Sequence, residues 1–149
     1  MRFLAVRCGL LVTLALPWCA PPAGAGEPAK PSGAAVWDRF RGPNGTGTSD
    51  DKDVPLTFGP DENLIWKVEL PGTGNSSPVV WGKRLFLQTA DDDGKRRSLL
   101  CLDTADGKIL WQKGIPAQPA KIRADSSLAS STPTTDGKAV YVAFWDGKD

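Results

Sequence analysis

The chain has 149 residues, of which 40% are hydrophobic and 23% are charged. These proportions are ordinary for globular proteins, so they exclude a disordered polyelectrolyte and a protein with many membrane spans. The formal charge of +1 provides no global field that would favour nucleic acid or an anionic membrane surface as a partner. Because the chain has no histidine, imidazole acid–base catalysis and histidine-ligated metals are excluded from this stretch.

The first 25 residues have the features of a secretory signal peptide. Arg2 and Arg7 form a positively charged start, residues 8–16 are apolar or small, and Ala23-Gly24-Ala25 supplies the small residues of a cleavage site. This apolar stretch is too short for a transmembrane helix, which needs roughly 20 residues. We therefore expect a signal peptide over residues 1–25, a periplasmic or secreted mature protein, and no membrane span.

A flexible linker is predicted over residues 26–36, which are rich in proline, glycine and alanine. The ordered domain is then expected over residues 37–149. Loss of the leader would remove two cysteines and leave Cys101 alone. A single cysteine cannot form a disulfide framework, so we expect a buried, unreactive thiol and a fold stabilised by apolar burial.

The mature sequence predicts an all-β protein. Short runs rich in valine, leucine, isoleucine and aromatic residues alternate with glycine, aspartate and proline, and no stretch has a sustained helical period. The connections at 82–83, 91–94, 103–107 and 136–138 have the composition of tight turns. The predicted strands are residues 63–70, 76–81, 84–89, 98–102, 108–113, 130–135 and 139–144.

An internal repeat organises these strands. Residues 77–87 align without a gap on residues 132–142, an offset of 55. Pro78 and Pro133 coincide in this alignment, as do Gly82 and Gly137. The apolar triplet that follows each glycine coincides as well, so the two segments predict the same pair of antiparallel strands.

A second internal similarity has an offset of 45 residues. It pairs residues 64–67 with residues 109–112 and brings Trp66 into the same phase as Trp111. The extra ten residues of the first offset can be placed in the polar stretch 114–127. Periods of this size, with about four strands each, indicate the blades of a β-propeller.

Two segments resemble a known family. Residues 102–111 resemble the A-L-D-x-x-T-G-K-x-x-W signature of pyrroloquinoline-quinone-like (PQQ-like) β-propeller repeats, with Asp103, Gly107 and Trp111 at its fixed positions and an Asp106-Gly107 pair in place of Thr-Gly. Residues 37–45 are similar to the W-x-x-F-R-G-P-x-G opening of secreted bacterial members. The resemblance implies four-stranded antiparallel blades in which the tryptophan docks between neighbours.

The expected architecture is a partial propeller with one complete blade and two partial ones. Residues 76–81, 84–89, 98–102 and 108–113 supply the four strands of the complete blade. Residues 63–70 would be the outer strand of the preceding blade, and the strands after residue 130 would begin the next. Because a propeller needs roughly 4 to 8 blades to close, we expect residues 37–149 to be the N-terminal part of a longer domain and the remaining blades to be its partners.

In a four-stranded meander, the connections after the second and fourth strands emerge on one rim. Loops 90–97 and 114–128 are therefore predicted to lie side by side, and loops of this kind commonly carry binding function. Possible partners at this rim are envelope proteins or polymers. The acidic run 91–93 has the spacing of a turn rather than of an EF-hand calcium loop.

Two functional classes remain open. The first is a non-catalytic scaffold of the bacterial cell envelope, and the second is a quinoprotein dehydrogenase that uses PQQ with calcium. The resemblance implies that catalytic members clamp the quinone against a ring made by two adjacent cysteines, which a mature chain with Cys101 alone cannot form. We therefore assign no catalytic, cofactor-binding or metal-binding residue in this segment, and we expect PQQ to matter only if a site lies beyond it.

Overall fold

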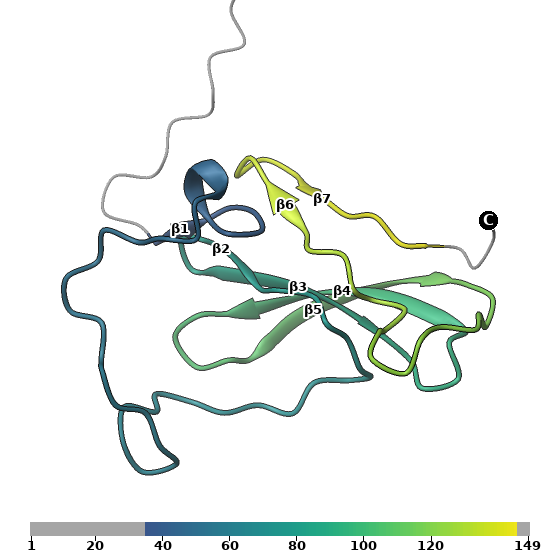
Figure 1. Cartoon of the computed structure of the whole chain (residues 1–149), viewed down its shortest axis with the longest axis horizontal. Coiled ribbons are helices and arrows are strands. Elements are labelled where there is room, and N and C mark those ends of the chain that lie inside the picture. Colours follow the sequence, from purple (N-terminus) through teal and green to yellow (C-terminus); the bar gives the residue numbers. More distant parts are fainter. Residues whose placement is uncertain (1–34, 146–149) are drawn as a thin grey trace, which may run out of the picture.

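The structure is a computed structural model, and it describes residues 35–145 (Figure 1). The predicted signal peptide and nearly all of the predicted linker lie outside these residues. In chain order the elements are β1 (Val36–Trp37), the 3-10 turn η1 (Pro43–Gly45), β2 (Val79–Trp81), β3 (Arg84–Ala90), β4 (Arg96–Asp103), β5 (Ile109–Pro116), β6 (Thr134–Thr135) and β7 (Val140–Tyr141).

The first sheet contains the predicted complete blade. Its five strands run antiparallel in the order β1-β2-β3-β4-β5, and each of the last four pairs with its neighbour in sequence. A two-residue turn joins β2 to β3, and Gly82 adopts the positive φ of 59° that such a turn requires. The prediction of an antiparallel meander is confirmed, and β3, β4 and β5 are longer than expected.

The strand predicted at 76–81 is regular only from Val79, although the chain stays beside β3 before that point. Thr73 forms an isolated bridge with Ala90, and the Ser76 hydroxyl accepts the backbone N–H of Gln88 at 3.1 Å. A side chain therefore replaces a ladder bond between these two regions, which shortens the regular strand.

The second sheet is the start of the next blade and consists of β6 and β7. Their register pairs Thr134 with Tyr141 and Thr135 with Val140. Both strands are shorter than the predicted 130–135 and 139–144. Because Pro133 has no N–H to donate, the ladder is interrupted where β6 begins.

The N-terminal segment ties the two sheets together. Val36 and Trp37 pair with the edge of β2. The carbonyl oxygen of Asp38 then accepts two hydrogen bonds from β6, one from the backbone N–H of Thr135 at 2.9 Å and one from the Thr134 hydroxyl at 3.0 Å. In Figure 1, β6 and β7 lie above the first sheet, with β6 close to β2. Val36 is therefore part of the folded structure, one residue inside the range predicted as a linker.

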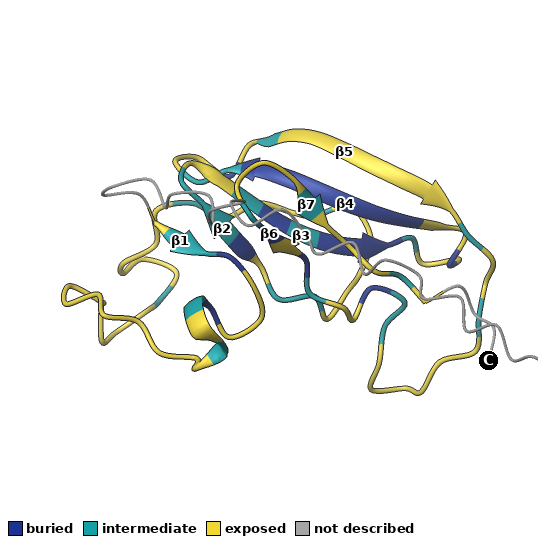
Figure 2. Ribbon diagram, turned by 90° about the horizontal axis from the view of Figure 1, so that it is seen from above, coloured by how far each residue is buried: buried dark blue, intermediate teal, exposed yellow. Residues whose placement is uncertain are grey.

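The apolar core lies around β4 and between the two sheets. Six consecutive residues of β4 are buried, whereas β5 is exposed along most of its length (Figure 2). Val79, Phe86, Leu99 and Cys101 form a buried cluster on the face that looks toward the second sheet, and Val140 packs against it. Burial against the neighbouring sheet is how a propeller blade covers its face, so the all-β partial propeller is confirmed.

One predicted element is wrong. Residues 63–70 form no strand, because no described segment pairs with them and a strand without a ladder leaves its backbone groups unbonded. The side chain that suggested the strand nevertheless makes the expected type of contact, since the Trp66 indole N–H donates to the Thr104 carbonyl at 2.9 Å. The segment is thus anchored to the first blade by its tryptophan and not by backbone pairing.

Candidate functional site

The repeat signature forms a closed turn between β4 and β5. The Asp103 carboxylate accepts the N–H of Ala105 at 2.9 Å, and the Asp106 carboxylate accepts the N–H of Lys108 at 2.9 Å. The backbone N–H of Gly107 donates to the Asp103 carbonyl at 3.0 Å. These local bonds explain why the signature has an aspartate at the position of Asp103 and a glycine at that of Gly107, and Asp106, which replaces the threonine of the signature, closes the end of the turn.

Trp66 covers this turn. Its ring lies against Gly107, where an added Cβ would approach ring carbon Cε3 to 2.5 Å, and Gly107 has a φ of 73°. Only glycine satisfies both the backbone conformation and the close approach. Trp66, Asp103 and Gly107, which were singled out from the sequence, therefore come together in one contact.

A second tryptophan repeats this arrangement between the two sheets. Trp81 lies against Gly137, which has a φ of 83° in the turn between β6 and β7, and a Cβ at that position would overlap the indole ring. Gly82, its counterpart in the repeat, has open space around it. Pro133 is fully buried and Pro78 is exposed. Sequence reasoning missed the role of Trp81, because the repeat alignment places an aspartate at the equivalent position.

Trp111 has no glycine turn against it among residues 35–145. Its side chain is 37% exposed, and its ring centroid lies 6.0 Å from that of Phe86. The Lys113 ammonium nitrogen lies 5.6 Å from the Trp111 ring centroid. Trp111 therefore faces the space between the two sheets, and its expected docking on a following blade stays a prediction.

The two rim loops meet as predicted. The N–H of Ala117 donates to the Lys95 carbonyl at 2.8 Å. The Arg97 guanidinium donates through Nη1 to the carbonyl of Gly94 and through Nη2 to the carbonyl of Gln118, the latter at 3.1 Å. The Arg97 side chain is fully buried, so one cation bridges the backbones of both loops. The sequence gives no sign of this role, because Arg97 is the last of three consecutive basic residues, Lys95-Arg96-Arg97, and nothing local distinguishes it from the other two.

The acidic run at this rim is a turn, as predicted. Asp93 accepts the backbone N–H of Lys95 at 3.0 Å and pairs with its ammonium at 3.0 Å, and these interactions hold the pKa of Asp93 below its usual range. The Asp91 carboxylate oxygen Oδ2 lies 3.9 Å from the Arg96 guanidinium nitrogen Nε. Within residues 35–145, no group of three or more histidine, cysteine, aspartate or glutamate side chains could hold a metal ion.

The Cys101 thiol lies in the core of β4. Burial is the main reason that its pKa is raised above its usual range, with Asp103 contributing in the same direction and Arg84 opposing it. It is free and buried, and the residues on either side are leucines. A ring of two adjacent cysteines therefore has no counterpart at this position.

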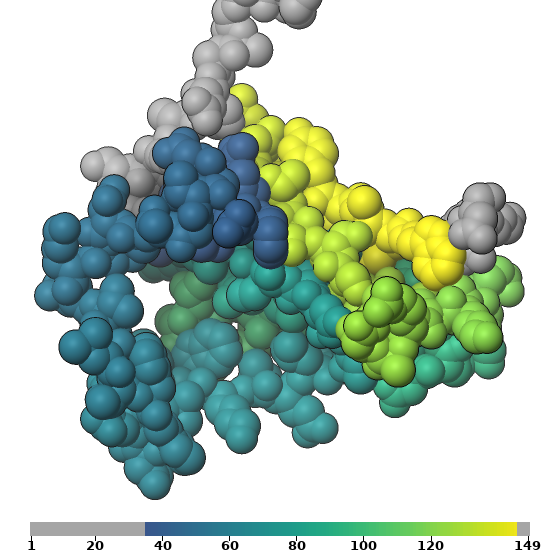
Figure 3. Space-filling model, viewed as in Figure 1, coloured from purple at the N-terminus to yellow at the C-terminus, as the bar shows by residue number. Residues whose placement is uncertain are grey.

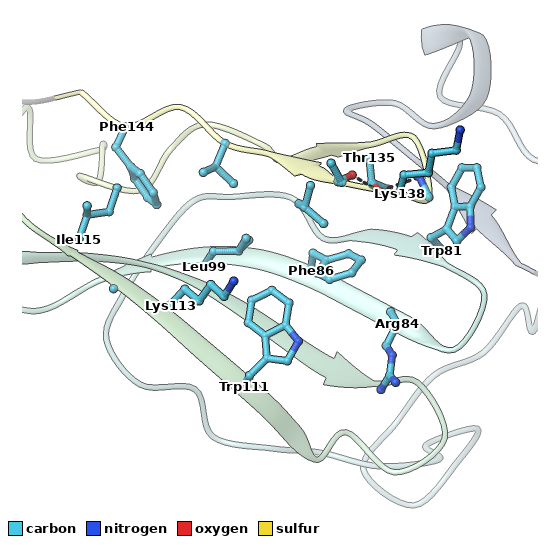
Figure 4. A pocket seen from close by; sticks show the side chains of 15 residues that line it. Trp81, Arg84, Phe86, Leu99, Trp111, Lys113, Ile115, Thr135, Lys138 and Phe144 are labelled. Atoms are coloured by element: carbon cyan, nitrogen blue, oxygen red, sulfur yellow. Dashed lines mark hydrogen bonds between the residues drawn. The ribbon is translucent and has the colours of Figure 1, made fainter. Parts of the chain in front are cut away.

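A groove of about 610 Å³ lies between the two sheets (Figure 4). Phe86, Leu99 and Trp111 line it from the first sheet, while Val140 and Phe144 line it from the β7 side. The charged residues of its lining are all basic: Arg84, Lys113 and Lys138. The groove is thus an apolar slot with a positively charged border.

These features define a repeat protein of the β-propeller class, built from antiparallel blades that dock through tryptophan–glycine contacts. Comparison with family models is more specific. Residues 57–148, well over half of the chain, match the model described as outer membrane protein assembly factor BamB, and the chain belongs to this family of PQQ-like repeats. Searches of curated proteins and of solved structures found no match. No helix in the described part of the chain is long and apolar enough to span a membrane.

Proposed function

We propose that this chain is a non-catalytic PQQ-like propeller protein of the bacterial cell envelope, periplasmic or secreted, that acts as a binding or assembly scaffold. The matching family model is named for an assembly factor, which supports such a role. The signal sequence predicted over residues 1–25 is consistent with export across a membrane.

The observation that carries the proposal is the joined rim. Loops usually sample many conformations and lose that freedom when they bind. Here the buried Arg97 guanidinium and the Ala117–Lys95 backbone bond hold two loops in one arrangement before a partner arrives. Preorganisation lowers the entropic cost of association, so the rim is suited to recognising a protein or polymer surface.

The residues present do not fit a PQQ–calcium centre. Cys101 is a lone buried thiol, and the Asp93 carboxylate is already engaged by Lys95. We therefore propose that this segment binds no PQQ and has no catalytic residues.

Photo-crosslinking tests the scaffold role. A photoreactive residue is placed at Lys95 or Lys121 on the rim, and at Lys108 in the opposite turn as a matched exposed control. The full chain is expressed in the envelope of a Gram-negative bacterium. Adducts with other envelope components are expected from the two rim positions and not from Lys108. Equal yields at all three positions, or none at the rim, would overturn the proposal.

A further inference from the structure

A second pocket lies beside the N-terminal segment, near the turn between β2 and β3. Its volume is about 390 Å³, which is typical of a site for a small molecule. Its walls come from residues 35–51 and from Val80 of β2. Figure 3 shows residues of this segment, in blue, at the surface at one end of the molecule. The pocket, which we name the N-terminal pocket, is therefore built by one continuous stretch of chain and one strand of the complete blade.

Part of the N-terminal pocket is apolar and is held in place by strand pairing. Val36 and Trp37 form β1, which pairs with Trp81 and Val80 of β2. The Trp37 ring is also fixed by Gly42, because a Cβ added there would lie 2.5 Å from ring carbon Cε3. Such a surface can receive the apolar face of a ligand without first losing conformational freedom.

Two polar side chains in the lining are free to bind a ligand. Within residues 35–145, neither the Asn44 amide nor the Asp50 carboxylate has a hydrogen-bond partner. Asn44 lies in η1 with a φ of 63°, a left-handed conformation that asparagine tolerates better than most residues. Its amide both donates and accepts hydrogen bonds, whereas the ionised Asp50 carboxylate only accepts them. The N-terminal pocket therefore offers one donor group and several acceptor atoms.

The remaining polar residues of the lining bond to one another. The Thr46 and Thr48 hydroxyl oxygens lie 2.9 Å apart, and the Ser49 hydroxyl donates to the Asp51 carboxylate at 2.6 Å. The lining contains two carboxylates, Asp50 and Asp51, and no cationic side chain. An anionic ligand would be repelled from such a site. A ligand with several hydroxyl groups could instead donate charge-assisted hydrogen bonds to the carboxylates.

We propose that the N-terminal pocket binds one unit of a neutral saccharide. A sugar ring has a face of C–H groups and a border of hydroxyl groups, each of which both donates and accepts hydrogen bonds. The C–H face would lie against Trp37 and Val36, while the hydroxyl groups donate to Asp50 and exchange hydrogen bonds with the Asn44 amide. This site goes beyond the proposed scaffold function, and it uses a surface other than the rim.

Nuclear magnetic resonance titration of the isotope-labelled mature full chain tests this site. The probes are cellobiose, maltose and N,N′-diacetylchitobiose, with glucuronic acid and methylammonium as charged comparisons. At least one neutral sugar should give saturable shifts of the Trp37 indole N–H, the Asn44 side-chain amide and the backbone amides of residues 46–51. Glucuronic acid should bind more weakly than that sugar, because Asp50 and Asp51 repel its carboxylate.

Two variants and a matched control assign the binding to named side chains. Asn44→Gly removes the amide and introduces a residue that adopts a positive φ without strain. Asp50→Ala removes the free carboxylate. Each variant should weaken the dissociation constant of the sugar by at least about tenfold. Asp53→Ala should bind as the parent does, because Asp53 is an exposed acid that lies outside the pocket lining.

All three substituted side chains are exposed, so the variants should keep the circular dichroism of the parent. The proposal is overturned if none of the three neutral sugars saturates these signals, or if methylammonium binds there and the sugars do not. It is also overturned if both variants bind the sugar as tightly as the parent, or if Asp53→Ala loses as much affinity as they do. These results are independent of the rim crosslinks, so either idea can fail alone.

Discussion

Replacing Gly107 by alanine tests whether tryptophan docking holds the signature turn. Gly107 has a φ of 73°, and alanine in the left-handed region costs about 1–2 kcal/mol. The new methyl group would also lie 2.5 Å from the Trp66 ring, and such overpacking costs about 1–3 kcal/mol more. Gly107→Ala is therefore expected to lower the free energy needed to open the turn by about 2–5 kcal/mol.

Gly82→Ala is the matched control for the backbone cost. Gly82 also has a positive φ, 59°, but a Cβ there meets nothing within 4 Å, so only about 1–2 kcal/mol is expected. Amide hydrogen exchange measures local opening at each site, and the Gly107 N–H, which is bonded to the Asp103 carbonyl, is the reporter for its turn. Each additional 1.4 kcal/mol accelerates exchange about tenfold.

A double-mutant cycle separates the ring contact from the backbone cost. In a Trp66→Ala background the overlap disappears, so Gly107→Ala should cost no more there than Gly82→Ala costs in the parent chain. The reasoning is refuted if Gly107→Ala accelerates exchange no more than its control does, or if removal of the ring leaves its cost unchanged.

Three further predictions concern pH, thiol reactivity and the cofactor. The Asp136 carboxylate accepts the N–H groups of Ala139 and Lys138 at 2.8 and 2.9 Å, which lowers its pKa. The ionised carboxylate stabilises the β6–β7 turn, so this stabilisation is complete above the ordinary aspartate pKa and is lost as pH falls through the lowered pKa. The pH dependence of the Lys138 backbone amide signal reports this loss. The same pH dependence in Asp136→Asn would contradict the prediction. Burial raises the pKa of Cys101, so a thiol reagent at neutral pH should react slowly until denaturant is added, and fast labelling of the native chain would show the thiol to be accessible. Titration of PQQ with calcium into the chain should give neither saturable binding nor dye-linked alcohol oxidation, and turnover would reverse the non-catalytic proposal.

Local features of this protein could be predicted because they depend on neighbours in sequence. The turn at 103–107 closes through hydrogen bonds between residues at most five apart, so its aspartates and glycine identify it directly. The meander from β2 to β5 follows from short apolar runs that are separated by tight turns. The shared rim of the loops 90–97 and 114–128 follows from strand order alone.

Other features depend on partners that no local pattern reveals. The segment 63–70 has a strand-like composition but no neighbour to pair with, so it stays irregular and is anchored only through Trp66. Val36 and Trp37 form a strand too short to have a period, and they do so because β2 presents an open edge. The contact of Trp81 with Gly137 joins residues that are distant in the chain.

The amino-acid sequence was enough to predict the repeat, the all-β class, the blade strands and the chemistry of the signature turn, because each depends on residues that are close together along the chain. The tertiary structure decided which edges are paired, which tryptophan meets which glycine, and that the buried Arg97 joins two loops. It also decided that three cations border the apolar groove between the two sheets. The physical reason is that pairing and burial are properties of two surfaces brought together, and one segment of sequence specifies only its own side.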